Sequence, residues 1–187
     1  MDQPGLDPSL AEKAAKIKLL LLDVDGVLTD GKLYFSSDDV QFKAFHTLDG
    51  HGIKMLMRSG VEVGIISGRE NPAVTRRASE LGIKLLIQGR EDKYQALEEL
   101  LREFSCPLDR IAYMGDDYPD LLVMTRVGLA LSVPNGAHAV RCHAHWLSTQ
   151  RGGEGAVREA CDMIMIAQNT YADALAAYVH SERPVKP

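Results

Sequence analysis

The stretch IKLLLLDVDGVLTDG, residues 17–31, decides the fold of this chain. It begins with a mostly apolar run that ends at Leu22, and the carboxylates of Asp23 and Asp25 follow at once. Unpaired carboxylates are costly to desolvate, so packing alone does not explain Asp-x-Asp at the end of a buried strand. A cation or a reaction must compensate the pair. Because Gly26 also allows a sharp turn around a ligand, the segment indicates a phosphate-handling active site.

Short apolar runs alternate with helical patterns along the rest of the chain. Strands are expected at 17–24, 61–67, 83–87, 111–115 and 127–132, and helices at 50–58, 71–81, 92–104, 117–125, 155–167 and 170–179. In the range 92–104, for example, Leu97, Leu100 and Leu101 share one helical face. Such alternation predicts an α/β fold with a doubly wound, mostly parallel sheet and right-handed crossovers.

Length, charge and cysteine usage indicate one domain, 1–187, in the cytoplasm. At 187 residues the chain is long enough for a real core and short for two domains. A net charge of −5 argues against nucleic acid as the main partner. No apolar stretch approaches the roughly 20 residues needed to span a bilayer, and the first residues lack a signal-peptide pattern. Three cysteines without CxxC spacing favour reduced thiols, and residues 181–187 are expected to form a flexible tail.

One segment, 32–45, breaks the alternation. Two aromatic, β-prone runs flank Ser36-Ser37-Asp38-Asp39, which predicts a hairpin with a four-residue loop. Its apolar side chains are Leu33, Tyr34, Phe35, Val40, Phe42 and Phe45. A lone hairpin that exposes them would be marginal in water. The hairpin therefore either folds onto its own domain or buries these side chains in an oligomer contact.

Polar groups follow the first four predicted strands, at the strand end or at the start of the next helix. They are Asp23 and Asp25, then Ser67-Gly68-Arg69, then Lys93, then Asp116 and Asp117. In an open parallel sheet, ligands bind at the carboxyl ends of the strands. Chance could place any one of these groups there, but the whole set predicts a common site.

This set fits phosphoryl transfer through an aspartyl phosphate. Asp23 is the candidate nucleophile, and Asp25 is placed to protonate the leaving alkoxide and later to deprotonate water. Mg²⁺ prefers hard oxygen ligands, so Asp23, Asp25 and Asp116, together with a backbone carbonyl, are its candidate ligands.

Positive charge and hydrogen-bond donors complete the expected catalytic set. Lys93 supplies a second cation, while Ser67 and nearby backbone N–H groups can donate to phosphoryl oxygens. Asp117 and Asp120 are expected to hold Lys93 or metal-bound waters.

Four sequence segments together resemble the motifs of the haloacid dehalogenase superfamily of phosphatases. They are DVDGVLTDG, IISGRE, GREDKYQAL and MGDDYPDLLVM, and the resemblance extends over residues 17–166. It implies a Rossmann-like core, Mg²⁺ dependence, Asp23 as nucleophile and Asp25 as acid/base. The phrases FHTLDGHGIK and GGEGAVRE are similar to sugar-acid phosphatases of lipopolysaccharide precursor synthesis. The expected reaction is then hydrolysis of 3-deoxy-D-manno-octulosonate 8-phosphate.

That subfamily lacks an inserted cap domain over the site. Only about 36 residues lie between Asp30 and Ser67, too few for a folded cap. The resemblance implies a homotetramer in which hairpins like 32–45 assemble and a neighbour shapes each pocket. It also raises the question whether the C-terminal tail enters a neighbour's site.

Contacts to an anionic sugar acid require cations for its carboxylate. Lys54, Arg69 and Arg77 are candidates, because arginine matches carboxylates bidentately. The resemblance adds Asp25, His46, Thr47, Leu48, Asp49, Gly50 and Lys93 to the substrate contacts. Arg77 fits a solvated helix surface equally well. The Gly-rich loop 151–155 could bound the pocket or simply begin a helix.

Three other functions share part of this pattern. A response-regulator receiver also uses an aspartate, Mg²⁺ and a lysine, but it does not need a second aspartate two residues later. A phosphatase for nine-carbon keto-sugar acid phosphates, and a catalytically silent oligomerisation module, remain alternatives. The presence of Asp23, Asp25, Lys93 and Asp116 favours an active enzyme.

Overall fold

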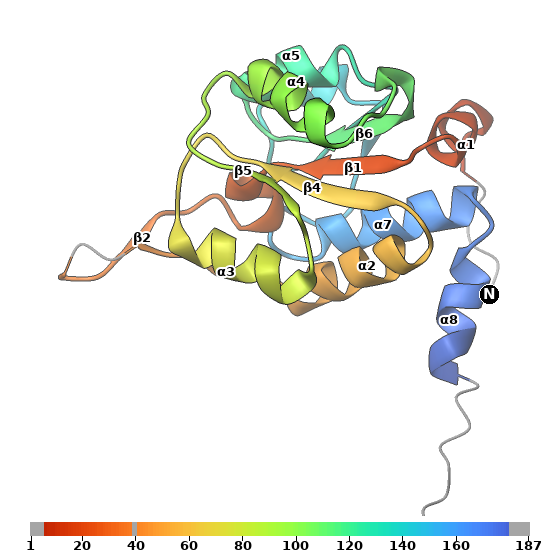
Figure 1. Ribbon diagram of the computed structural model, residues 1–187, viewed down its shortest axis with the longest axis horizontal. Helices are drawn as coiled ribbons and strands as arrows, with labels where there is room; N and C mark the ends of the chain where they lie inside the picture. The colour runs from red at the N-terminus through yellow and green to blue at the C-terminus, as the bar shows by residue number, and fades with distance from the viewer. Residues whose placement is uncertain (1–5, 39–40, 180–187) are drawn as a thin grey trace, which may run out of the picture.

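In the computed structural model, which describes residues 6–38 and 41–179, the apolar run before Asp23 forms β1 (Leu19–Leu22) near the centre of a six-stranded sheet. The strand order is β5-β4-β1-β6-β7-β8, and neighbouring strands are parallel (Figure 1). The other strands of this sheet are β4 (Glu62–Ile66), β5 (Leu85–Ile87), β6 (Ile111–Met114), β7 (Leu129–Ser132) and β8 (Trp146–Leu147). The predicted doubly wound α/β fold is confirmed.

Helices cover both faces of this sheet. They are α1 (Pro8–Ala15), α2 (Thr47–Arg58), α3 (Pro72–Leu81), α4 (Lys93–Glu103), α5 (Leu121–Met124), α6 (His138–His143), α7 (Ala156–Ala167) and α8 (Tyr171–Val179), with shorter turns η1 (Val24–Leu28), η2 (Leu108–Arg110) and η3 (Tyr118–Asp120). Successive side chains of a strand point to opposite faces. Leu20 and Leu22 accordingly pack with α1, α2, α3 and α7, while Leu19 and Leu21 pack with α4, α5 and α6 (Figure 1). Burial on both faces explains why β1 is apolar throughout.

Several predicted boundaries differ from the structure for local reasons. The strand expected at 127–132 begins at Leu129, because the Val127 N–H donates to the Val123 carbonyl in the turn after α5 and the Gly128 N–H donates to the Leu108 carbonyl of η2. The helix expected at 117–125 is divided into η3 and α5. Helix α2 begins earlier than expected, at Thr47, because the ring of His46 accepts a hydrogen bond from its first turn.

Elements α1, α6 and β8 were not predicted. Helix α1 has a clear start signal, since the Asp7 carboxylate accepts hydrogen bonds from the N–H groups of Ser9 and Leu10. Its buried Leu10 and Ala14 then pack against the sheet's helical layer. Among the described residues, no helix has the length and apolar character required to cross a membrane.

The predicted hairpin is present as β2 (Tyr34–Phe35) and β3 (Gln41–Phe42), which extend away from the sheet (Figure 1). Phe35 pairs with Gln41, so the connection is longer than the four residues expected. Leu33, Tyr34, Phe35 and Phe42 are exposed. Phe45 is half-buried against the core, so at this residue the segment folds onto its own domain. Val40 and the tail 181–187 lie outside the described residues.

Candidate active site

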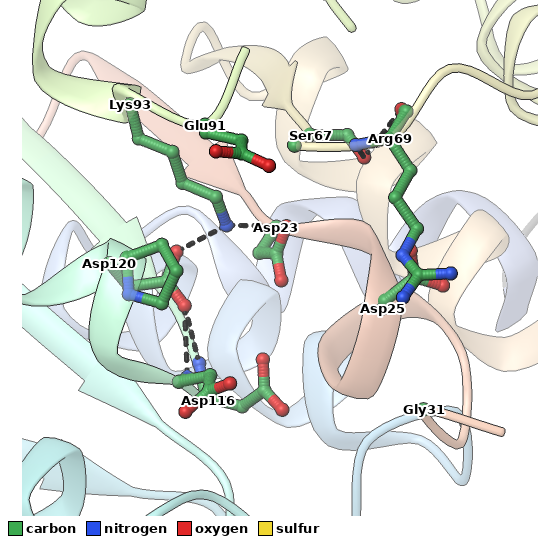
Figure 2. A pocket seen from close by; sticks show the side chains of 12 residues that line it. Asp23, Asp25, Gly31, Ser67, Arg69, Glu91, Lys93, Asp116 and Asp120 are labelled. Atoms are coloured by element: carbon green, nitrogen blue, oxygen red, sulfur yellow. Dashed lines mark hydrogen bonds and ion pairs between the residues drawn. The ribbon is translucent and has the colours of Figure 1, made fainter. Parts of the chain in front are cut away.

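The strand register brings the predicted site residues to one edge of the sheet. Leu22 of β1 is paired with Ile65 of β4 and with Met114 of β6, so the three strands end at the same level. The residues beyond these ends enclose a cavity of about 570 Å³ (Figure 2). It is lined by Asp23, Asp25, Gly31, Ser67, Gly68, Arg69, Glu91, Lys93, Asp116, Asp117, Pro119 and Asp120. The structure therefore brings the four predicted segments together in one pocket.

The loop after β1, residues 23–31, is here called the Asp loop. Its sharp turn depends on Gly26, whose φ is +97°, a conformation that residues with a side chain rarely adopt. Thr29 ties the loop together, because its hydroxyl donates to the Val24 carbonyl and accepts from the N–H of Gly31. The N–H of Asp23 donates to the Met114 carbonyl at 3.0 Å. The loop is thus fixed to the sheet at the point where Asp23 leaves it.

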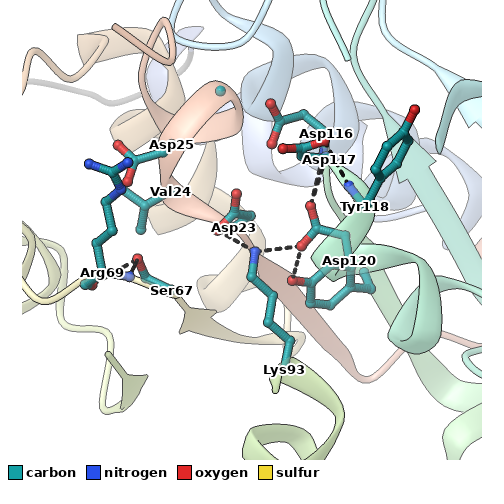
Figure 3. A network of polar contacts seen from close by, with 12 residues as sticks. Asp23, Val24, Asp25, Ser67, Arg69, Lys93, Asp116, Asp117, Tyr118 and Asp120 are labelled. Atoms are coloured by element: carbon teal, nitrogen blue, oxygen red, sulfur yellow. Dashed lines mark hydrogen bonds and ion pairs between the residues drawn. The ribbon is translucent and has the colours of Figure 1, made fainter. Parts of the chain in front are cut away.

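Lys93 lies at the bottom of the pocket, between two carboxylates (Figure 3). Its Nζ lies 2.7 Å from Asp23 Oδ1 and 2.5 Å from Asp120 Oδ1, and its side chain is 5% exposed. Helix α4 positions it as the first helical residue, after the Asp92 side chain that caps the helix. Burial lowers the pKa of Lys93, but the charges of Asp23 and Asp120 outweigh it and raise the pKa overall. Lys93 is therefore a permanent cation of the site.

Asp120 supports both Lys93 and the loop that carries Asp116. Besides Lys93, it accepts a hydrogen bond from the Tyr113 hydroxyl at 2.7 Å and from the N–H groups of Asp116 and Asp117 at 3.0 Å each. Its side chain is fully buried, so these partners replace water. This geometry agrees with the supporting role predicted for Asp120. Asp117 lines the pocket, and its own carboxylate caps η3.

Burial raises the pKa of two carboxyl groups in the pocket. Desolvation raises the pKa of Asp23 to about 6, with the nearby Lys93 opposing the shift. The pKa of Asp116 rises to about 8, first because of burial and then because of the charges on Asp23 and Asp120. Burial and neighbouring carboxylates thus disfavour the charged forms of both groups, and Lys93 offsets this only in part.

The carboxylates of Asp23, Asp116 and Asp120 form a group suited to a divalent cation. One oxygen atom of each lies within 4.8 Å of the others. Within the described part of the chain, the buried Oδ1 of Asp116 has no hydrogen-bond partner, and carboxylate oxygens are the ligands that Mg²⁺ prefers. Because Asp120 already accepts from Lys93, Tyr113 and two amides, Asp23 and Asp116 are the better ligands. The carboxylate of Asp25 lies outside this group.

Ser67 and Arg69 form the opposite wall of the pocket. The Ser67 hydroxyl donates to the Arg69 carbonyl at 3.0 Å and accepts from the Arg69 N–H at 3.3 Å. Figures 2 and 3 show the Arg69 side chain extending toward Asp25. Arg69 therefore places a cation at the wall of the pocket, beside Asp25.

Two polar residues that contact the Asp loop were missed from the sequence. Lys43, just after β3, forms an ion pair with Asp25. Asn135 lies between the Asp loop and the Gly-rich loop, where its Nδ2 donates to the Gly26 carbonyl and its Oδ1 accepts from the Gly152 N–H. The pocket also contains Gly31, Glu91 and Pro119, which were not predicted.

The Gly-rich loop 151–155 packs against the Asp loop rather than lining the cavity. A Cβ on Gly152 would lie 1.7 Å from the Gly26 carbonyl oxygen, so a side chain does not fit there. The Gly153 N–H donates to the Val27 carbonyl at 2.9 Å. The small residues thus allow two backbones to approach closely.

Most of the predicted substrate contacts around α2 do not reach the pocket within one chain. His46, Asp49, Gly50 and Arg77 border a separate, very small cavity, while Thr47 and Leu48 are exposed and Lys54 is half-buried. Asp49 has a structural partner, because its Oδ1 accepts from the Arg158 N–H in the first turn of α7 at 2.8 Å. Gly50 leaves space for the Arg77 guanidinium, which a Cβ would approach to 2.2 Å.

Several known proteins are similar to this chain. Residues 86–160 match the family described as haloacid dehalogenase-like hydrolase. The 3-deoxy-D-manno-octulosonate 8-phosphate phosphatase of Yersinia pestis is 43% identical over 158 residues, which cover 84% of each chain. That of Salmonella typhimurium is 40% identical over 169 residues, or 90% of each chain.

Two crystal structures are similar over nearly the whole fold. A probable YrbI family phosphatase from Pseudomonas syringae pv. phaseolica superposes with a TM-score of 0.92 at 50% identity, covering 94% of this chain and 100% of that one. The 3-deoxy-D-manno-octulosonate 8-phosphate phosphatase from Moraxella catarrhalis, in complex with a magnesium ion, a phosphate ion and a KDO molecule, has a TM-score of 0.88 at 43% identity. The superposition covers 90% of this chain and 97% of the Moraxella chain.

Proposed function

Because the chain belongs to the haloacid dehalogenase-like hydrolase family, we propose that it hydrolyses 3-deoxy-D-manno-octulosonate 8-phosphate to 3-deoxy-D-manno-octulosonate and phosphate, in a Mg²⁺-dependent step of lipopolysaccharide precursor synthesis. The observation that carries this proposal is the placement of Asp23 beside both Lys93 and Asp116, whose buried Oδ1 has no hydrogen-bond partner among the described residues. Relatives at about 40% identity that bear this activity support the choice of substrate.

In the first half of the reaction, the Asp23 carboxylate attacks phosphorus and forms an aspartyl phosphate. The bond between phosphorus and the sugar oxygen breaks, and Asp25 gives its proton to that oxygen. In the second half, Asp25 takes a proton from water, and the water oxygen attacks phosphorus. Phosphate leaves, and the Asp23 carboxylate and the proton on Asp25 are restored.

Positive charge in the pocket lowers the barrier to both halves. Asp23, Asp116 and a backbone carbonyl, with Asp25 the candidate for that third contact, would hold Mg²⁺, which would supply positive charge to offset the phosphoryl oxygens. Lys93 orients Asp23 and contributes a second cation. Ser67 and the backbone N–H groups after β4 donate to the phosphoryl oxygens.

Substrate selection is proposed to involve Arg69 and a second copy of the chain. The pocket is bordered by Arg69 but not, within one chain, by Lys54 or Arg77. We infer a homotetramer in which the exposed hairpin residues are buried and a neighbour brings the residues around α2 to the pocket. The free thiols of Cys106, Cys142 and Cys161 are consistent with a cytoplasmic enzyme.

Phosphate release from purified protein tests this proposal. We expect Mg²⁺-dependent turnover with kcat/KM highest for 3-deoxy-D-manno-octulosonate 8-phosphate, lower for nine-carbon keto-sugar acid phosphates and lowest for hexose phosphates. Asp23→Asn, which keeps the shape of the side chain, should abolish turnover without unfolding the protein. A clear preference for hexose phosphates would contradict the substrate, and undiminished activity of Asp23→Asn would contradict the mechanism.

A further inference from the structure

Lys43 is a buried cation that the proposed mechanism does not use. Its side chain is 3% exposed, and its Nζ forms an ion pair with Asp25 Oδ1. A lysine is seldom buried unless its charge is paired. The pairing joins two segments that are 18 residues apart, one at the Asp loop and one at the base of the hairpin.

Lys43 approaches Asp25 from outside the catalytic cavity. It borders the groove between the hairpin and α3, together with Phe42, Glu70 and Asn71, and it is not among the residues that line the pocket. Asp25 itself lines the pocket, and its side chain is 23% exposed. Among the described residues, no hydrogen bond is made to Asp25 Oδ2. One carboxylate oxygen is therefore held by Lys43, while the carboxylate still lines the pocket, on the side toward which Arg69 extends.

We propose that Lys43 is a positioning residue for Asp25, the acid/base group of the proposed function on which this inference rests. By binding Oδ1, it fixes the orientation in which Oδ2 meets the oxygen between phosphorus and the sugar. A small error in this orientation is costly, because proton transfer requires hydrogen-bond reach. When the Asp25 proton moves to the leaving oxygen, the ammonium group also lies beside the carboxylate that remains.

The effect of losing Lys43 should depend on whether the leaving group must be protonated. A sugar alkoxide must be protonated as its bond to phosphorus breaks, whereas p-nitrophenolate leaves without a proton. Loss of Lys43 should therefore slow the first half of the reaction with a sugar phosphate much more than with p-nitrophenyl phosphate. A merely structural role would slow both to the same extent.

Single-turnover release of the leaving group from each substrate tests this inference, since it reports the first half-reaction alone. We expect Lys43→Met to reduce the rate with the sugar phosphate about 10-fold or more, and the rate with p-nitrophenyl phosphate at most about threefold. Lys43→Arg, which keeps the charge, should recover part of the loss. The matched control is Lys32→Met, because Lys32 is also a hairpin lysine near an aspartate, but its side chain is 73% exposed.

The ratio of the two rates in one preparation does not depend on the folded fraction, so it remains informative if Lys43→Met is less stable. Equal losses with both substrates, or no loss with either, would overturn the inference. A wild-type protein that rejects the sugar-acid phosphate but cleaves another alkyl phosphate would contradict only the proposed substrate. The Lys43 comparison would then be made with that alkyl phosphate.

Discussion

Asp116 occupies the space that a side chain on Gly26 would need. A Cβ on Gly26 would lie 2.0 Å from Asp116 Oδ2. Because Gly26 has no Cβ, the Asp loop can make its turn and Asp116, a candidate metal ligand, can take its position. This contact connects the end of β1 directly with the end of β6.

Replacement of Gly26 by alanine should impair both stability and magnesium binding. The positive φ at Gly26 is strained for alanine, at a cost of about 1–3 kcal/mol, and the new methyl group displaces Asp116. Gly60→Ala is the matched control, because Gly60 has a φ of +98° and a Cβ there would have no neighbouring atom within 4 Å. We expect both variants to lose stability in urea unfolding. Only Gly26→Ala should require more Mg²⁺ for half-maximal activity, and equal magnesium requirements would contradict the role of this contact.

Asp116→Asn should change the pH dependence of stability in the metal-free protein. The folded-state pKa of Asp116 is raised to about 8, so between about pH 4 and pH 8 the folded protein binds a proton that the unfolded chain releases. The wild-type carboxyl group therefore costs increasing stability as the pH rises through this window, and asparagine removes that cost.

Urea unfolding with a chelator at pH 5, 6, 7 and 8 measures this effect. The stability of Asp116→Asn relative to the wild type should increase from pH 5 to pH 8. The difference between the two unfolding free energies removes the contributions of ionisable groups that both proteins share. One such group is His145, whose pKa is lowered by burial. A difference that is constant with pH would show that Asp116 ionises normally.

Asn135→Ala should loosen the Asp loop from the Gly-rich loop. It removes hydrogen bonds to the Gly26 carbonyl and from the Gly152 N–H, which we expect to cost about 1–3 kcal/mol and to reduce kcat. Asn135→Asp keeps the acceptor for Gly152 but loses the donor to Gly26, so it separates the two bonds. Ser59→Ala, which removes a hydrogen bond at the end of α2, is the control. If Asn135→Ala and Ser59→Ala affect kcat equally, the bridge has no bearing on the reaction.

The hairpin should determine the size of the assembly. Phe35 and Phe42 are 62% and 57% exposed in one chain, and a contact that buries them is weakened by polar replacements. In light scattering, we expect the wild type to exceed the 20.5 kDa of one chain and Phe35→Ser/Phe42→Ser to approach it. Leu122→Ser, at an exposed apolar residue on α5, should leave the mass unchanged. A double variant with unchanged mass would show that assembly uses another surface.

The edge of the sheet that carries the candidate site could be predicted from the sequence, because neighbouring parallel strands end at the same edge. Once Asp23, Ser67 and Asp116 were placed at strand ends, the sheet topology determined that they meet, and the helix start at Lys93 added the cation. These are local signals combined by a general rule of parallel sheets.

The missed contacts depend on long-range packing. Nothing in the hairpin sequence marks Lys43 as buried, and only the approach of the hairpin to the Asp loop covers it. Asn135 bonds Gly26 across 109 residues. The Asp49 carboxylate caps α7, again 109 residues away in the chain. Periodicity and strand ends carry no information about such pairings.

Asp25 lies between two segments of different stability: β1, which leads into the Asp loop, and the hairpin of β2 and β3, which leads to Lys43. β1 is hydrogen-bonded to strands on both edges, whereas β2 and β3 pair only with each other among the described elements. Segments with few buried contacts open at lower free energy than a central strand. A brief opening of the hairpin would thus withdraw Lys43 from Asp25 while Asp23 stays in place. Amide hydrogen exchange would then be fast in the hairpin and slowest in β1, so that Asp25 and the lysine that orients it belong to units of different lifetime.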